Sequence, residues 1–310
     1  MRIGYPCINR TLGCKGSRTF RLKSYSEERL VSTVRNNLDC LLNMLRFNVE
    51  HDILFFRITS DLVPFASHPV CDFDWLEYFD LDFKAIGKFI IAQNIRISMH
   101  PGQFTVLNSP QEGVMESSIK ELEYHTQVLD AMGLDRSAKI QLHIGGVYGS
   151  KEKGMTRFME RYHALDSRIK RRLIIENDER NYSLADCLQI HSHTRVPILF
   201  DSLHHELNNT GETVEEVFTL LVPTWSQEDG LAMIDYSSSR TSAQRLRHTE
   251  SIDLQHFTQF ITRTRPHDCD IMLEIKDKEK SALKAVEMLR SDDRFNNLPE
   301  EISSEYAPGL

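Results

Sequence analysis

The chain has 310 residues, a formal net charge of −8 and 40% hydrophobic residues. This length and composition suffice for one large globular domain. No apolar run reaches the about 18 residues that cross a bilayer, and no signal-peptide segment opens the chain, so we expect a cytoplasmic protein. The acidic balance argues against broad nonspecific coating of DNA. The six cysteines lack metal-ligand spacing and are expected to be reduced packing residues.

Eight short apolar runs alternate along the chain with segments long enough for helices. The runs are residues 2–5, 53–58, 96–100, 140–143, 173–176, 196–201, 231–235 and 271–274. Segments 28–49 and 75–93 are typical of the helix-length stretches between them, and Ser26 is a candidate helix cap. Eight such βα units in about 300 residues predict an α/β fold, a single-domain (β/α)8 TIM barrel. We expect the barrel to span residues 1–290 and a polar tail to span 291–310.

Six of the runs end on a side chain that can bind a metal ion. These residues are His100, His143, Glu176, Asp201, Asp235 and Glu274. The carboxyl ends of all barrel strands meet on one face, where the active sites of such barrels lie, so we expect the six to cluster there. His68, in the loop 60–74, and His204, three residues after Asp201, extend the candidate set, with His248 as a less certain member.

This set of ligands is too large for one ion. Carboxylates can bridge ions, so we expect two or three metals with Glu176 and Glu274 as candidate bridges. Mixed imidazole and carboxylate donors suit Mn²⁺ or Zn²⁺, and the absence of cysteine removes the strongest preference for Zn²⁺. Three divalent ions would bring the formal charge from −8 to −2. Clustered ions of this kind clamp the attacking and leaving oxygens of a phosphodiester.

Three classes of function are compatible with such a cluster. The first is a metal-dependent nuclease, and the second is a sugar isomerase or epimerase of the xylose-isomerase-like barrels. The third is a metal-dependent nucleic-acid-binding module. The number of ligands favours the nuclease. The first loop, residues 6–24, carries five basic residues and few acids, and it is either a phosphate-contacting loop or a solvated one. Residues 147–154 are glycine-rich and are expected to form a loop.

Several sequence blocks together resemble the UV damage endonucleases. They are Gly4-Tyr5-Pro6-Cys7 with Asn9, Ser98-Met99-His100-Pro101-Gly102-Gln103, His143-Ile144-Gly145-Gly146, Glu176-Asn177-Asp178, Asp201-Ser202-Leu203-His204-His205 and Glu274-Ile275-Lys276-Asp277. The resemblance covers about residues 2–285 in the family's order. Single blocks also occur in the related endonuclease IV barrels, which cut at abasic sites, so an endonuclease IV-like activity is an alternative.

The resemblance implies a (β/α)8 barrel with three metal ions, usually Mn²⁺, with Zn²⁺, Co²⁺ or Mg²⁺ as alternatives. It implies incision of double-stranded DNA immediately 5′ to cyclobutane dimers and 6-4 photoproducts, leaving a 3′-hydroxyl and a 5′-phosphate. One barrel that binds one lesion needs no partner subunit, so we expect a monomer. The matching metal positions are His68, His100, His143, Glu176, Asp201, His204, His248 and Glu274, of which Glu176, Glu274, His100 and His143 are the candidate catalytic residues. Gln103 and Phe104 match the pair that wedges into the duplex, and Tyr5 and Asn9 match the pocket for the flipped lesion.

Three positions depart from the family pattern. Asp235 stands where a histidine ligand is expected, and it can still coordinate a metal ion. Met233 stands where family members often carry a lysine near the metals, and its side chain supplies no charge. Phe104 stands where tyrosine is common. These departures leave the reaction class standing and bear on metal choice, rate and lesion range.

Overall fold

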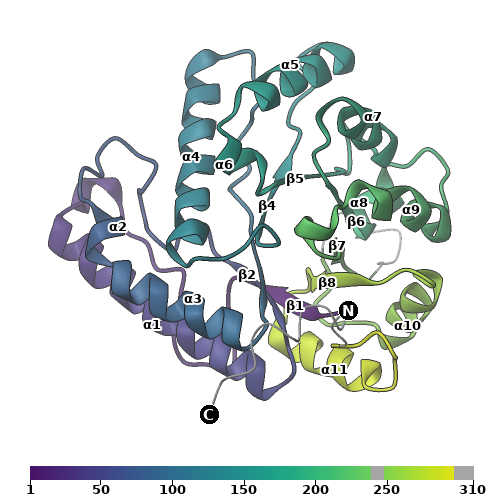
Figure 1. The fold of residues 1–310 in the computed structure, drawn as a ribbon, viewed down its shortest axis with the longest axis horizontal. Coiled ribbons are helices and arrows are strands. Elements are labelled where there is room, and N and C mark those ends of the chain that lie inside the picture. The colour runs from purple at the N-terminus through teal and green to yellow at the C-terminus, as the bar shows by residue number, and fades with distance from the viewer. Residues whose placement is uncertain (239–247, 297–310) are drawn as a thin grey trace.

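The computed structural model describes residues 1–238 and 248–296, and within them eight parallel strands close into a barrel surrounded by helices (Figure 1). The strands are β1 (Ile3–Pro6), β2 (Phe55–Ile58), β3 (Arg96–Met99), β4 (Lys139–His143), β5 (Leu173–Glu176), β6 (Ile198–Asp201), β7 (Ala232–Tyr236) and β8 (Cys269–Leu273). Each strand pairs with its neighbours in sequence, and β1 closes the barrel against β8. The prediction of a TIM barrel is confirmed.

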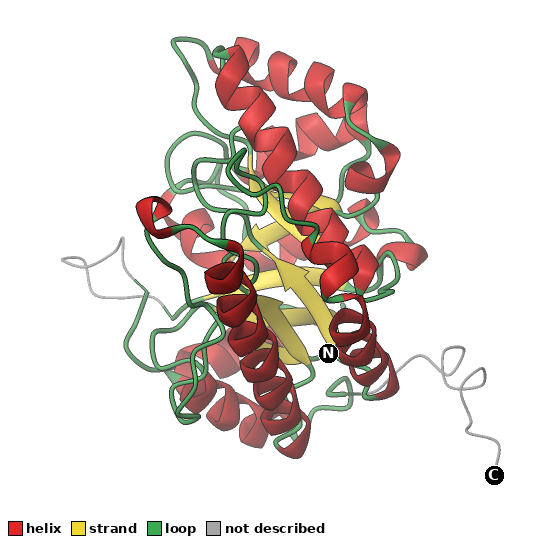
Figure 2. Ribbon diagram, turned by 90° about the vertical axis from the view of Figure 1, so that its left-hand side faces the viewer, coloured by secondary structure: helices red, strands yellow, loops and turns green. Residues whose placement is uncertain are grey.

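The helices lie outside the strands, as Figure 2 shows. They are α1 (Glu27–Glu50), α2 (Trp75–Tyr78), α3 (Asp80–Ala92), α4 (Glu112–Ala131), α5 (Lys151–Ala164), α6 (Ser167–Lys170), α7 (Leu184–Thr194), α8 (Ser202–Leu207), α9 (Val214–Leu221), α10 (Leu254–Arg263) and α11 (Glu279–Leu289). Three short 3-10 segments lie between strands and helices: η1 (Leu22–Ser24) before α1, and η2 (Val222–Thr224) and η3 (Gln227–Asp229) between α9 and β7.

Local sequence explains where several helices begin. The Ser26 side chain accepts a hydrogen bond from the backbone N–H of Arg29 and caps α1, as expected. The segment 75–93 holds two helices, α2 and α3, because the chain bends at Phe79. The expectation of a loop through residue 154 is wrong from Lys151 onward. Ser150 accepts from the backbone N–H of Lys153 and so starts α5 inside the glycine-rich stretch.

The barrel interior is layered. Its middle is filled by five buried apolar side chains, one from each of five strands: Phe55, Ile174, Leu199, Met233 and Met272. Toward the amino ends of the strands the interior is ionic, where Arg96 donates to Asp270 over 2.7 Å and Lys139 pairs with Asp229. Burial alone would raise the pKa of Asp270, but Arg2 and Arg96 outweigh burial and hold the pKa at about 2. The apolar layer therefore separates these ion pairs from the opposite end of the barrel.

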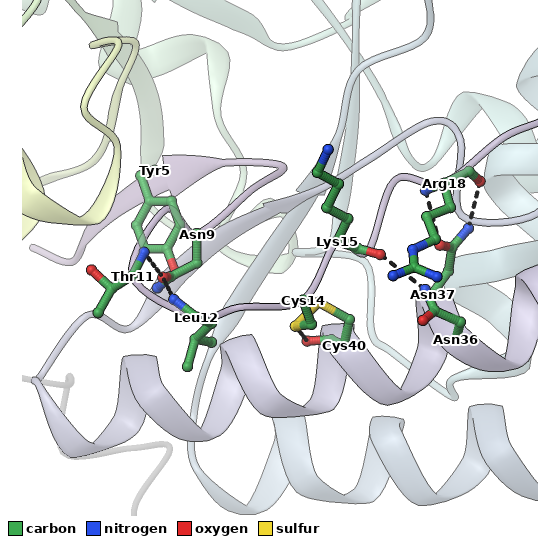
Figure 3. The surroundings of a disulfide bond; sticks show 10 residues. All are labelled: Tyr5, Asn9, Thr11, Leu12, Cys14, Lys15, Arg18, Asn36, Asn37 and Cys40. Atoms are coloured by element: carbon green, nitrogen blue, oxygen red, sulfur yellow. Dashed lines mark hydrogen bonds between the residues drawn. A yellow bond between two sulfur atoms is a disulfide. The ribbon is translucent and has the colours of Figure 1, made fainter.

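The first loop folds back onto α1, and Figure 3 shows the contacts that hold it. Cys14 in the loop forms a disulfide with Cys40 in α1, with their Cα atoms 5.8 Å apart. The Asn37 side chain accepts from the backbone N–H of Arg18 over 2.9 Å and donates to the Arg18 carbonyl over 3.0 Å. The expectation that all six cysteines are reduced is therefore wrong for this pair. The two come together through the tertiary fold, which spacing in the sequence does not show.

The start of the chain and residues 291–296 pack against each other. The amino group of Met1 donates to the carbonyl of Arg294 over 2.6 Å, and the backbone N–H of Asn296 donates to the Met1 carbonyl over 2.8 Å. The rest of the expected tail, residues 297–310, lies outside the described residues, so the boundary at residue 290 stays a prediction. Among the described residues, no helix is both long and apolar enough to span a membrane.

Candidate metal centre and its DNA-facing loops

The structure brings seven of the nine candidate ligands into three overlapping groups. The groups are His100, His143 and Glu176; Glu176, Asp201 and His204; and Asp201, Asp235 and Glu274, with the ligand atoms of each group within 4.8 Å of one another. All come from the carboxyl ends of strands β3 to β8 or from the residues just after them. Glu176 belongs to the first two groups and Asp201 to the last two. Glu176 and Asp201 are thus the two shared residues, and Glu274 belongs to one group alone. The bridging roles stay predictions.

The first group converges on one carboxylate oxygen. Glu176 Oε1 lies 3.1 Å from His100 Nε2 and 3.2 Å from His143 Nε2. No hydrogen bond from the described residues satisfies this buried oxygen. Burial would raise the pKa of Glu176, but the His143 and His100 imidazoles outweigh burial and lower the pKa below its usual value. A buried carboxylate that faces two imidazole nitrogens is a donor set that fits a divalent ion.

The second group is held in place by Asn177. Its side chain accepts from the backbone N–H of Asp201 and donates to the Asp201 carbonyl, both over 3.0 Å. Its own carbonyl lies 3.0 Å from His204 Nδ1, which places the imidazole proton on Nδ1 and leaves Nε2 as the ligand atom. Burial would lower the pKa of His204, but Asp201 and Glu176 raise it to about 9. Burial raises the pKa of Asp201 to about 7, although His204 opposes the rise.

The third group contains a cation that sequence reasoning missed. Arg57, on β2, donates from Nη2 to both carboxylate oxygens of Asp235, over 2.6 and 2.7 Å, and its Nη1 pairs with Glu274. Gln141, also missed, donates to Asp235 over 2.9 Å and to Glu176 over 3.3 Å. Burial would lower the pKa of Arg57, but Asp235 and Glu274 outweigh burial and raise it, so the guanidinium stays charged.

The remaining two candidate ligands stand outside the three groups. His248 Nε2 lies 3.3 Å from Glu274 Oε2, at the edge of the third group. His68 is exposed in the loop after β2, and its Nδ1 accepts a hydrogen bond from the backbone N–H of Val70 over 3.0 Å. Their roles as ligands stay predictions.

The sequence matches the UV-endonuclease UvdE family over residues 1–306. The chain belongs to this family. A UV DNA damage endonuclease from Clostridium perfringens (strain 13 / Type A) is 38% identical over 299 residues, covering 96% of this chain and 73% of the relative. One from Bacillus cereus (strain Q1) is 34% identical over 301 residues, covering 94% of this chain and 95% of the relative.

Solved structures agree with this assignment. The crystal structure of SacUVDE superposes with a TM-score of 0.91 at 44% identity and covers 95% of this chain and 99% of its own. Endonuclease IV from Thermus thermophilus reaches a TM-score of 0.58 at 15% identity, covering 81% of this chain and 93% of its own. A D-psicose 3-epimerase reaches 0.52 at 12% identity, covering 81% of this chain and 92% of its own. The last two show the barrel fold alone.

In this UvdE-family chain, the expected wedge residues lie at the tip of a tight turn beside the metal centre. The backbone N–H of Thr105 donates to the Gly102 carbonyl over 2.9 Å, which places Gln103 and Phe104 at the two central positions of the turn. Both side chains are exposed, and Phe104 is 82% exposed. The turn follows His100 directly. An exposed aromatic at this position is therefore not a packed loop residue.

The two residues expected to line the lesion pocket, Tyr5 and Asn9, are both buried. Tyr5 is fully buried, and its hydroxyl donates to Asn48 Oδ1 over 2.7 Å and accepts from Asn9 Nδ2 over 2.9 Å. Asn9 in turn accepts from the backbone N–H groups of Thr11 and Leu12. Tyr5 thus supports the first loop through Asn9, and direct contact of Tyr5 with a base would require this loop to shift.

The first loop presents its basic side chains to solvent. The exposed residues are Arg10, Lys15, Arg18, Arg21 and Lys23. The loop is tied to α1 by the disulfide and to the start of α11 by Glu279, which accepts from the backbone N–H of Arg10 and the hydroxyl of Thr11. The protein is acidic overall, but this loop is held in place and exposes a cluster of positive charge, which suits contact with a phosphate backbone.

Proposed function

We propose that this protein is a divalent-metal-dependent endonuclease that cuts DNA immediately 5′ to cyclobutane pyrimidine dimers and 6-4 photoproducts. The nick leaves a 3′-hydroxyl and a 5′-phosphate. One observation carries the proposal: two of the three ligand groups share Glu176 at the carboxyl end of a barrel whose relatives are named UV DNA damage endonucleases.

We infer Mn²⁺ as the preferred ion, with Zn²⁺, Co²⁺ and Mg²⁺ as alternatives, because the donors are imidazoles and carboxylates without a thiolate. His100, His143 and Glu176 would hold one ion, and Glu176, Asp201 and His204 would hold a second. Bound at these residues, the ions would supply Lewis-acid polarisation of the phosphodiester and a more acidic attacking water. Asn177 bonds the Asp201 backbone and Gln141 bonds the Glu176 carboxylate, so both ligands are held in position by hydrogen bonds that do not depend on the ions.

The partner is double-stranded DNA that carries a lesion, bound by a single barrel. Phe104 fills the space that the extruded bases leave, and the Gln103 amide bonds the orphaned bases opposite. Extrusion costs least where stacking and pairing are already weak, and this is the source of selectivity for damaged sites. The basic side chains of the first loop hold the flanking phosphate backbone.

Incision of a defined duplex tests the proposal. A 5′-labelled duplex with one cyclobutane dimer is incubated with the protein and Mn²⁺, beside an undamaged duplex, a duplex with an abasic site, and a free ketose. We expect one nick on the 5′ side of the dimer and none in the undamaged duplex, with Glu176→Gln as the inactive control. Cutting of the abasic duplex alone favours an endonuclease IV-like activity. Epimerisation of the ketose without nicking would overturn the proposal.

A further inference from the structure

Arg57 reaches the metal-ligand layer from inside the barrel. Its side chain is 3% exposed, and the side chains of its partners Asp235 and Glu274 are 1% and 19% exposed. Asp235 is paired with β2 by this guanidinium and with β4 by Gln141, so three of the eight strands meet at one carboxylate. Both carboxylate oxygens of Asp235 accept a hydrogen bond from Nη2, so the guanidinium engages the whole carboxylate group.

The guanidinium lies where a third ion would have to bind. Two of the three members of the third group, Asp235 and Glu274, are the two partners of Arg57. A divalent ion on the same oxygens would stand within a few ångströms of a fixed positive charge, in an interior that screens charge poorly. The guanidinium already compensates these two carboxylates, so an added ion would gain less attraction there than elsewhere in the site.

The other two groups differ in this respect. The ion pairs of Glu176 are with His100 and His143, and those of Asp201 are with His204. Imidazole can give up its proton and coordinate, whereas an arginine side chain has no lone pair to offer and stays charged. Met233, two residues before Asp235 on β7, lies in the apolar layer and adds no charge. His248 and His204 also contact members of the third group, Glu274 and Asp201, but among the described basic side chains Arg57 alone pairs with both Asp235 and Glu274.

We propose that Arg57 serves as a built-in third cation, so that this protein binds two divalent ions and not three. The guanidinium fixes Asp235 and Glu274 at the edge of the two-ion site and is a positioning residue, since its burial keeps it from DNA. This inference rests on the proposed metal-dependent function, and it concerns the number of ions and not the reaction.

The number of bound ions tests the inference without any measurement of incision. Protein stripped with chelator is dialysed against saturating Mn²⁺, and bound manganese is measured per chain by elemental analysis and by the loss of the free Mn²⁺ signal in electron paramagnetic resonance. We expect two ions in the wild type and two in Asp235→Asn, because Asp235 bonds Arg57 and not a metal ion. Removal of the guanidinium in Arg57→Ala opens the third group, and we expect three.

A matched control and the wild-type count keep the test decisive. Arg96→Ala removes another buried arginine that pairs with an interior carboxylate, beneath the apolar layer, and should leave the count at two. Three ions in the wild type, or the loss of one ion in Asp235→Asn, overturns the inference even if Arg57→Ala does not fold. A count of two in folded Arg57→Ala also overturns it. A wild type that binds no divalent ion would overturn the proposed function as well.

Discussion

Replacing Phe104 with alanine separates a DNA-inserting side chain from a structural one. Because Phe104 is 82% exposed, its removal takes almost no apolar area out of the core. The free energy of unfolding should therefore change by no more than about 0.5 kcal/mol, as for other surface substitutions. A packed aromatic would instead cost about 3–5 kcal/mol on truncation.

The effect on DNA binding should be much larger and confined to damaged duplex. Stacking of an aromatic side chain on a base contributes about 1–3 kcal/mol. With about 1.4 kcal/mol for each factor of ten, loss of the ring should weaken binding to a lesion-containing duplex by about 5- to 150-fold. Undamaged duplex offers no vacated space for the ring, so binding to it should change far less.

Fluorescence anisotropy with paired duplexes provides the measurement. One duplex carries a single cyclobutane dimer and the other none, and both carry an uncharged methylphosphonate at the incision position so that no cutting competes. Ile91→Ala is the control, because Ile91 is also an exposed large apolar residue but lies near the end of α3 at the amino ends of the strands. Equal weakening on both duplexes, or a lower melting temperature with no change in binding, would refute the wedge assignment.

Three further predictions address the metal centre, the lower ion pairs and the disulfide. Glu176→Gln should lose at least one bound Mn²⁺ and all incision while unfolding stays cooperative, and unchanged metal content would contradict its bridging position. Asp270→Asn should cost about 3–5 kcal/mol of stability at neutral pH, because it leaves Arg96 buried without its partner, and should leave the Mn²⁺ count unchanged. Since the pKa of Asp270 is about 2 in the folded chain and 3.8 unfolded, its stabilisation is present above pH 4 and lost toward pH 2. The difference from wild type in urea unfolding should therefore shrink by about 2 kcal/mol over that range. Cys14→Ser removes the disulfide to Cys40, which closes a loop with a sequence separation of 26, and should lower the free energy of unfolding by about 3 kcal/mol. Reduction of the wild type should have the same effect, and a stability that does not respond to a reductant would contradict the pairing.

Strand ends could be predicted because the chain itself marks them. His143, Glu176 and Asp201 each close an apolar run, and parallel strands in a closed barrel deliver such residues to one face. The family resemblance added the turn at Gln103 and Phe104, which composition does not single out. For these residues the local pattern and the final position agree.

Arg57 could not be placed in the same way. All four residues of β2 are buried, on both faces of the sheet, so the strand lacks the alternation that would show which side chains point inward. A single charged residue inside an apolar run carries no signal of its position in the folded chain. Asp235 and Glu274 come to lie opposite Arg57 only through the tertiary fold. The register that pairs Asp201 with Asp235 across β6 and β7 and the closure of β1 on β8 bring them there. The disulfide was missed for a related reason, since it depends on how the first loop folds over α1.

The five apolar side chains across the middle of the barrel separate the ion pairs at the amino ends of the strands from the candidate metal ligands at the carboxyl ends. Below them, Arg96 with Asp270 and Lys139 with Asp229 are paired charges, whose field falls off with distance faster than that of a single charge. If both partners of such an ion pair are replaced together in a related chain, the electrostatic potential at the candidate metal ligands should therefore change little. A change in one partner alone would send the field of an uncompensated charge through a layer that screens poorly.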